Sequence, residues 1–296
     1  MKNWFVTGAI LLAACISTTA QVKGVKHVIV IGMDGLGAYA FPKSDIPHIK
    51  SLMNEGAWSL EARSVLPSSS AVNWASMVMG AGPELHGFTE WGSQKPELPS
   101  RELDQYGLFP SIYTLLRQQQ PKSEIGVIFN WGGYGYLFPK AAVNTWANPA
   151  DTYLTIDSAI TYLSTKKPDL LFIHLDEPDH VGHNIGHNTP AYFEQVHKND
   201  SLVGKVIAAM KEADMWDNSI ILLTADHGGI DKGHGGKTMQ EMQIPWIIRG
   251  KGIRKNHEIG QSIVTYDTAA TLAWIFGLKT PQVWVARPVT EAFEKR

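Results

Sequence analysis

The sequence predicts an α/β fold, a mostly parallel central sheet with helices on both faces, in three αβα layers. Apolar runs of strand length alternate with segments of helical spacing, an order typical of covered parallel sheets. Acidic and histidine residues follow several of these runs, at the edge where such sheets bind ligands. Hydrophobic residues make up 44% of the 296 residues, and no repeat or low-complexity linker divides them. We therefore expect residues 21–296 to form one domain.

The first half of the chain gives three strands and three helices. Residues 25–31 (VKHVIVI) form a buried-strand run that stops at the turn GMDG. Pro47 then opens a helix that closes at Gly56, because proline suits the first helical turn and glycine the position after the last. The remaining elements of this half are strands at 58–65 and 124–129 and helices at 71–79 and 111–119.

The second half continues the alternation. Residues 151–166 have helical spacing, and the apolar run 169–175 (DLLFIHL) ends in the acidic turn DEPD. The other predicted elements are a long amphipathic helix at 192–213, strands at 219–224 and 244–248, and a last helix at 267–275.

The charge balance excludes general affinity for polyanions. Lys and Arg number 26 against 28 Asp and Glu, a net charge of −2, so we expect no nucleic-acid-binding surface. An anionic ligand would have to be held by a local site. No window after residue 20 approaches the roughly 18 apolar residues of a membrane span. The sequence carries no signal for a particular oligomeric state.

Residues 1–20 have the pattern of an export signal, with a leading lysine, an apolar stretch and a small residue at Ala20. Cleavage before Gln21 is favoured and would remove Cys15, the one cysteine, which excludes disulfides and thiolate metal sites in the mature chain. In the alternative, LAAC is a lipoprotein box and Cys15 becomes a lipidated first residue. Both interpretations place the protein outside the bacterial cytoplasm, with the periplasm favoured.

Three polar clusters follow three predicted strands. Asp34 follows the first, Asp179 follows DLLFIHL with His183 four residues on, and Asp226 and His227 follow SIILLT. His234 lies in the glycine-rich GHGG nearby. Carboxylates and imidazoles without sulfur suit Zn²⁺, with Mn²⁺ or Fe as alternatives, and do not suit Ca²⁺. Taken singly, each residue could equally be a turn, cap or structural residue. We interpret four further histidines as structural: His174, His180, His187 and His197.

The segment LPSSSAVNW leads into an apolar helix that ends before Gly80. A lone serine at a helix start is usually a cap. The same place is also an anion site, because free N–H groups and the helix dipole point at the ligand. A serine hydroxyl beside Zn²⁺ would be partly ionised and nucleophilic without a histidine base.

These residues resemble the alkaline phosphatase superfamily, and most closely its type I phosphodiesterase/nucleotide pyrophosphatase family. The matching segments are VIVIGMDGL, LPSSSAVNWASMVMGAGPELHG, LDEPDHVGHNIG, and TADHGG followed by GHGG. The resemblance implies an alkaline phosphatase-like fold and a phosphodiesterase that works with two divalent metal ions, zinc being favoured. The implied ligands are Asp179, His183 and His234 for one ion, and Asp34, Asp226 and His227 for the other, to which the attacking Ser70 also binds. Asn73 matches an amide that hydrogen-bonds a non-bridging phosphate oxygen.

The chain also departs from this family. Ser70, Ala71 and Val72 stand where the family usually has threonine and often Phe-Pro. Only six residues separate His227 from His234, where larger relatives insert a long stretch that shapes the substrate pocket, so nucleotide specificity is not carried over.

Several other functions compete with the phosphodiesterase hypothesis. A sulfatase would have proline two residues and arginine four residues after its nucleophile, where Val72 and Trp74 stand. A phosphomonoesterase is the main alternative; a sugar-phosphate mutase, a phosphonate hydrolase and a non-catalytic zinc- or glycan-binding protein are disfavoured. A monoester has an additional charged oxygen, and no arginine lies near Ser70, although Lys232 could supply a charge. Trp74, Trp91, Trp131 and Trp146 could stack a base or sugar of the substrate, although packing is the commoner role.

Overall fold

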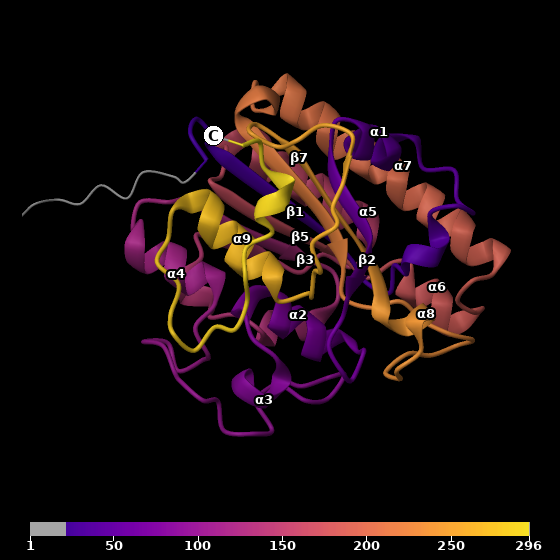
Figure 1. Ribbon diagram of the computed structural model, residues 1–296, viewed down its shortest axis with the longest axis horizontal. Coiled ribbons are helices and arrows are strands. Elements are labelled where there is room, and N and C mark those ends of the chain that lie inside the picture. Colours follow the sequence, from indigo (N-terminus) through magenta and orange to yellow (C-terminus); the bar gives the residue numbers. More distant parts are fainter. Residues whose placement is uncertain (1–21, 296) are drawn as a thin grey trace, which may run out of the picture.

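The computed structural model describes residues 22–295, which form an eight-stranded sheet between two layers of helices (Figure 1). The predicted export segment and Cys15 lie outside these residues. The strands are β1 (His27–Met33), β2 (Gly56–Arg63), β3 (Ile125–Phe129), β4 (Thr145–Ala147), β5 (Leu170–Leu175), β6 (Ser219–Ala225), β7 (Gln243–Gly250) and β8 (His257–Glu258). Their order across the sheet is β4-β3-β5-β1-β6-β7-β2-β8.

The predicted mostly parallel sheet is confirmed. β1 runs parallel to both its neighbours, β5 and β6, and β3 continues the parallel part to the edge strand β4. β7 is antiparallel to β6 and β2, which flank it. Every residue of β5 and β6 is buried, as expected for central strands covered on both faces.

The helices cover the two faces of the sheet in two groups (Figure 1). One face carries α1 (Pro47–Asn54), α5 (Thr152–Lys166) and α7 (Pro190–Glu212), and the other carries α2 (Ser70–Met79), α4 (Ile112–Gln119) and α9 (Asp267–Phe276). These six helices match the predicted ones to within two residues at each end. Short elements were not predicted, because they are too short to show a period: α3 (Pro83–His86), α6 (Asp179–Asn184), α8 (Met239–Met242) and the strands β4 and β8.

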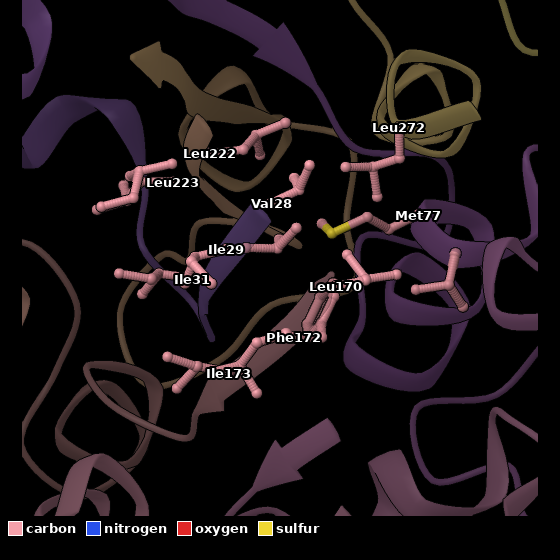
Figure 2. Packing of buried hydrophobic residues seen from close by; sticks show 14 of the residues in the cluster. Val28, Ile29, Ile31, Met77, Leu170, Phe172, Ile173, Leu222, Leu223 and Leu272 are labelled. Carbon is pink, nitrogen blue, oxygen red and sulfur yellow. The ribbon is translucent and has the colours of Figure 1, made fainter. Parts of the chain in front are cut away.

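The core lies on both sides of the central strands. Figure 2 shows Met77 of α2 and Leu272 of α9 against the side of the sheet that presents Val28 and Leu170. Side chains such as Ile31 of β1 point to the opposite side (Figure 2). Because both faces of β1, β5 and β6 are buried, a shift of one residue would misplace their side chains. The register of the three strands is therefore fixed, and with it the position of their ends. None of the helices within residues 22–295 has both the length and the apolar character needed to cross a bilayer.

Candidate active site

The three central parallel strands end at the same level of the sheet. Met33 at the end of β1 lies opposite Ala225 at the end of β6, and the last residue of β5 lies beside it. Asp34 and Asp226 directly follow two of these ends, and α6 starts shortly after the third. The sheet therefore delivers the predicted acidic residues to one edge, as the parallel topology requires.

Asp179, His183 and His234 form the first group of metal-ligand candidates. Four residues are about one helical turn, so α6 turns Asp179 and His183 to the same face, with His183 Nε2 3.1 Å from Asp179 Oδ2. The loop after β6 brings His234 Nε2 to 3.1 Å from His183 Nε2 and 3.9 Å from Asp179 Oδ2. Oxygen and nitrogen donors that converge in this way are a set that zinc binds.

The second group contains Asp34, Asp226, His227 and the Ser70 hydroxyl. His227 Nε2 lies 3.1 Å from Asp226 Oδ2 and 3.4 Å from Asp34 Oδ1. Ser70 Oγ lies 3.2 Å from His227 Nε2 and 3.4 Å from Asp34 Oδ1. Donor atoms of Asp34, His227 and Asp179 also lie within 4.8 Å of one another, so Asp179 connects the two groups.

Backbone carbonyls set the tautomers of the three ligand candidates that are histidines. Nδ1 lies 2.9 Å from the Lys232 carbonyl oxygen in His183 and 3.1 Å from the Ser68 carbonyl oxygen in His234. In His227, Nδ1 lies 2.8 Å from the carbonyl oxygen of Gly228. A carbonyl only accepts, so in the neutral form of each ring Nδ1 carries the proton and Nε2 is left with the lone pair that a metal ion would bind.

The carboxylates of the site are crowded and buried. Burial raises the pKa of Asp226 well above its usual range, and the nearby Asp34 and Asp179 raise it further. Burial also opposes ionisation of Asp179, but the His183 and His187 imidazoles hold the pKa of this carboxyl well below its usual range. The interaction with Asp179 raises the pKa of His183 to about 9, while burial lowers the pKa of His234 to about 4.

The donor set fits divalent metal ions. Asp34, Asp179 and Asp226 are buried, and every ion-pair partner they have within residues 22–295 is a histidine, with no lysine or arginine in reach. Asp179 Oδ1 and Asp226 Oδ2 are buried without a hydrogen-bond partner. Buried negative charge without compensation is costly, and bound cations remove that cost.

Of the three neighbouring serines, Ser70 is the one that faces the ligand groups. It is the first residue of α2 and is only 6% exposed. Ser68 uses its hydroxyl in the GHGG loop, where Oγ donates to the Gly236 carbonyl (2.7 Å) and accepts from the Gly235 N–H (3.2 Å). Ser69 precedes the helix, and its Oγ is buried without a hydrogen-bond partner.

The Asn73 side chain hydrogen-bonds the backbone of the loop before α2. Its side chain is fully buried, and its Nδ2 lies 3.1–3.2 Å from three backbone carbonyls, those of Val65, Pro67 and Ser69. Its Oδ1 accepts from the Val65 N–H at 2.7 Å. The amide therefore closes the loop before α2 in this structure, and its role toward a non-bridging phosphate oxygen stays a prediction.

Two side chains near Asp34 were not predicted to contribute. Trp74 Nε1 donates to Asp34 Oδ2 at 2.9 Å, and His174 Nε2 lies 3.3 Å from the same oxygen. Trp74 is fully buried and His174 belongs to β5, so both fix Asp34 from the core side. The sequence gives only an indirect sign of this contact. His174 is the last residue but one of a strand that pairs with β1, and Asp34 follows β1.

An aromatic pocket of about 520 Å³ opens next to α2. Its lining includes Trp91, Trp131, Tyr136, Lys140, Trp146 and Asn148. The Trp91 carbonyl accepts from the N–H of Ala71, the residue after Ser70, at 3.1 Å. The centroids of the Trp131 and His174 rings are 6.2 Å apart, and the His174 ring in turn contacts Asp34. Trp91 and Trp131 therefore link the pocket to the surroundings of Ser70 and Asp34, although neither of the latter two residues lines it.

Comparisons with known proteins identify the family of the chain. The family model for type I phosphodiesterase / nucleotide pyrophosphatase matches residues 28–238. A bis(5'-adenosyl)-triphosphatase from Mus musculus is 23% identical over 216 residues, 68% of this chain and 47% of the relative. Ectonucleotide pyrophosphatase/phosphodiesterase family member 5 from Homo sapiens is 21% identical over 243 residues, 77% of this chain and 50% of the relative. The chain spans about half the length of these curated relatives.

Solved structures confirm the alkaline phosphatase-like fold. The murine ectonucleotide pyrophosphatase/phosphodiesterase 5, solved with AMP, has a TM-score of 0.72 at 16% identity, covering 91% of this chain and 100% of its own. A phosphonate monoester hydrolase from Silicibacter pomeroyi has a TM-score of 0.67 at 15% identity, covering 89% and 75% of the two chains. At such identities these similarities establish the fold alone.

Proposed function

Because the chain belongs to the type I phosphodiesterase/nucleotide pyrophosphatase family, we propose that it hydrolyses phosphodiester or pyrophosphate bonds through a phosphoserine at Ser70. The observation that carries the proposal is the position of Ser70 Oγ, 3.2 Å from His227 Nε2 and 3.4 Å from Asp34 Oδ1. A hydroxyl at a helix start, beside two convergent sets of metal donors, is placed to attack phosphorus.

Two divalent ions are part of the proposal, with zinc favoured by a donor set of imidazoles and carboxylates without thiolates. The proposed ligands are Asp179, His183 and His234 for one ion, and Asp34, Asp226, His227 and Ser70 for the other. When bound, the ions would neutralise the carboxylates, favour the ionised serine and stabilise negative charge on the phosphoryl oxygens.

The reaction proceeds in two displacements. In the first, Ser70 Oγ releases its proton to solvent and bonds to phosphorus, while the bond from phosphorus to the departing oxygen breaks and that oxygen takes a proton from water. In the second, a water oxygen bonds to phosphorus, the Ser70 Oγ–phosphorus bond breaks, and the water's proton returns to the serine. The N-terminus of α2 directs its dipole at the phosphate in both steps.

The aromatic pocket favours a diester over a monoester. A diester needs room for a second organic group, and the pocket offers it close to the start of α2, where the carbonyl of its lining residue Trp91 accepts from the Ala71 N–H. A monoester has a further charged oxygen, which a guanidinium or ammonium group would have to neutralise. In this structure the Nζ of Lys232 donates to the Asn184 carbonyl at 2.9 Å and makes no ion pair with the carboxylates of the site. These two features together support a phosphodiesterase over the phosphomonoesterase alternative.

The test of the function combines one variant with two substrates. Ser70→Ala should lower kcat on bis-(p-nitrophenyl) phosphate by orders of magnitude and keep its metal content, with Ser68→Ala as the matched control. For the wild-type protein, kcat/KM should be higher with the diester than with p-nitrophenyl phosphate. Full activity of Ser70→Ala would overturn the nucleophile. A tenfold preference for the monoester, about 1.4 kcal/mol in transition-state binding, would overturn the diesterase assignment.

The proposal includes export to the periplasm, supported by the pattern of residues 1–20. N-terminal sequencing of protein from the periplasm should find Gln21 first, or a lipidated Cys15 in the alternative. An intact Met1 would refute both.

A further inference from the structure

His187 is buried against the first ligand group, although the sequence pattern does not distinguish it from a structural histidine. Its imidazole is fully covered, and its Nε2 lies 3.4 Å from Asp179 Oδ1. Both atoms are buried and neither makes a hydrogen bond within residues 22–295, so this ion-pair contact is the polar contact that each of them has there. The backbone N–H of His187 donates to the Asp231 carbonyl at 2.6 Å, which fixes the segment between α6 and α7.

His187 differs from the three histidines proposed as ligands. Each of those directs Nδ1 at a backbone carbonyl and leaves Nε2 free. In His187 both ring nitrogens face side chains, since Nδ1 lies 3.4 Å from the Tyr39 hydroxyl and Nε2 faces the carboxylate of Asp179. His187 also belongs to neither group of converging donor atoms within residues 22–295. It therefore acts on Asp179 and does not coordinate the ion itself.

The backbone makes room for this ring. A Cβ at Gly182 would come within 2.4 Å of the His187 ring, and a Cβ at Gly229 within 2.3 Å. Real Cβ atoms do not approach other atoms so closely, so both positions must lack a side chain for the ring to lie there. The two glycines come from α6 and from the loop after β6, which also supply His183 and His234. The ring is thus enclosed by the segments that build the first group.

The carboxylate of Asp34 shows the same arrangement in the second group. Its Oδ2 accepts from the indole N–H of Trp74 at 2.9 Å, while Oδ1 faces Ser70 and His227. In Asp179, Oδ1 faces the His187 ring and Oδ2 faces His183. In each carboxylate, one oxygen thus lies beside a buried ring that is not a proposed ligand, Trp74 or His187. The other oxygen faces the proposed metal ligands.

We infer that His187 is a positioning residue that donates its Nε2–H to Asp179 Oδ1 and so aims Oδ2 at the first metal ion. The inference rests on the metal-dependent function proposed above. Partners of this kind fix the orientation of a ligand, and their loss typically weakens metal binding by about 10- to 100-fold. The effect should be confined to the ion held by Asp179.

Zinc affinity, measured by competition with a chelator on folded protein, tests the inference without enzyme activity. His187→Phe keeps a ring in the glycine-lined space but removes the donor. It should lower the affinity for one of the two zinc ions by about 10- to 100-fold. His187→Gln retains an N–H near the position of Nε2 and should recover part of the affinity. His197→Phe, at an exposed position on α7, is the matched control and should bind both ions as the wild type does.

Equal zinc affinities for wild type and His187→Phe would overturn the inference, and so would equal weakening of both ions. A purely structural histidine would lower the melting temperature and leave both affinities unchanged. Should His187→Phe not fold, His187→Asn replaces it, because its shorter amide does not reach Asp179 and should bind zinc more weakly than His187→Gln. A wild-type protein that binds no zinc would refute the proposed function itself.

Discussion

Substituting alanine for Gly133 tests whether the aromatic pocket holds one organic group of the substrate. Gly133 lies in the short 3₁₀ turn Gly132–Tyr136, directly under the Trp131 indole. A Cβ there would meet three atoms of that indole at 2.2–2.5 Å, so the ring must leave its place. Gly132 is the matched control, because a Cβ at that position meets only Asn148 Oδ1, at 3.6 Å.

The size of the effect follows from the contact that is lost. Stacking of a base or similar ring on an aromatic side chain contributes about 1–3 kcal/mol. Trp91 and Trp146 remain in place, 67% and 45% exposed, so we expect a loss near the lower end. A loss of about 1.4 kcal/mol is a tenfold decrease in kcat/KM.

The assay uses two diesters with the same leaving group. Thymidine 5'-(p-nitrophenyl) phosphate and methyl p-nitrophenyl phosphate both release p-nitrophenol, but only the first has a ring-bearing second group. Gly133→Ala should lower kcat/KM about tenfold for the nucleoside ester and less than about twofold for the methyl ester. Gly132→Ala should leave both values within about twofold of the wild type.

Two results would refute this reasoning. Equal losses for the two esters would show that Gly133→Ala damages the reacting groups and not a subsite. Unchanged values for both esters would show that the Trp131 ring contributes nothing to binding. Melting temperatures of the three proteins identify a loss of folded enzyme.

Two further predictions concern metal and pH. Elemental analysis should find two zinc ions per chain, and chelation should abolish activity and lower the melting temperature, because a ligand bound only by the native state stabilises it; less than one metal per chain contradicts the proposal. His86 is buried between Ser76 Oγ and the Phe88 N–H, and burial lowers the pKa of its imidazole to about 3. Between about pH 6.5 and 3 the His86 imidazole binds a proton in the unfolded chain but not in the folded one. The stability that the neutral His86 contributes is therefore complete above pH 6.5 and declines as the pH falls. The free energy of unfolding of the wild type should decrease between pH 7.5 and 5 by about 2 kcal/mol more than that of His86→Gln; equal decreases would contradict this.

The parts of the fold that could be predicted are the strands and helices long enough to show a clear apolar run or a clear helical spacing. β1, β5 and β6 read as continuous apolar runs because both their faces are covered, and parallel strands end at one edge. That topology is why Asp34 and Asp226 could be expected together from the sequence. α6 has only six residues and no apolar stripe, so the sequence showed the spacing of Asp179 and His183 but not the helix that aligns them.

The parts of the site that could not be predicted depend on contacts between distant segments. His187 meets Asp179 because its backbone is tied to Asp231, far along the chain. The loop before α2 takes up the Asn73 amide, which no motif reveals. The four tryptophans likewise lie in different surroundings. Trp74 is buried against Asp34, while Trp91, Trp131 and Trp146 line the aromatic pocket, the last of them from β4.

α2 couples the nucleophile to the second ligand group. Ser70 and Trp74 lie four residues apart on this helix, and so on the same face. Ser70 Oγ lies 3.4 Å from Asp34 Oδ1, while the Trp74 indole donates to Oδ2 of the same carboxylate at 2.9 Å. Both contacts therefore tie the same turn of α2 to one carboxylate. The buried indole thus holds Asp34 beside Ser70, and if Ser70 is the nucleophile as proposed, this contact supplies the positioning that its attack requires.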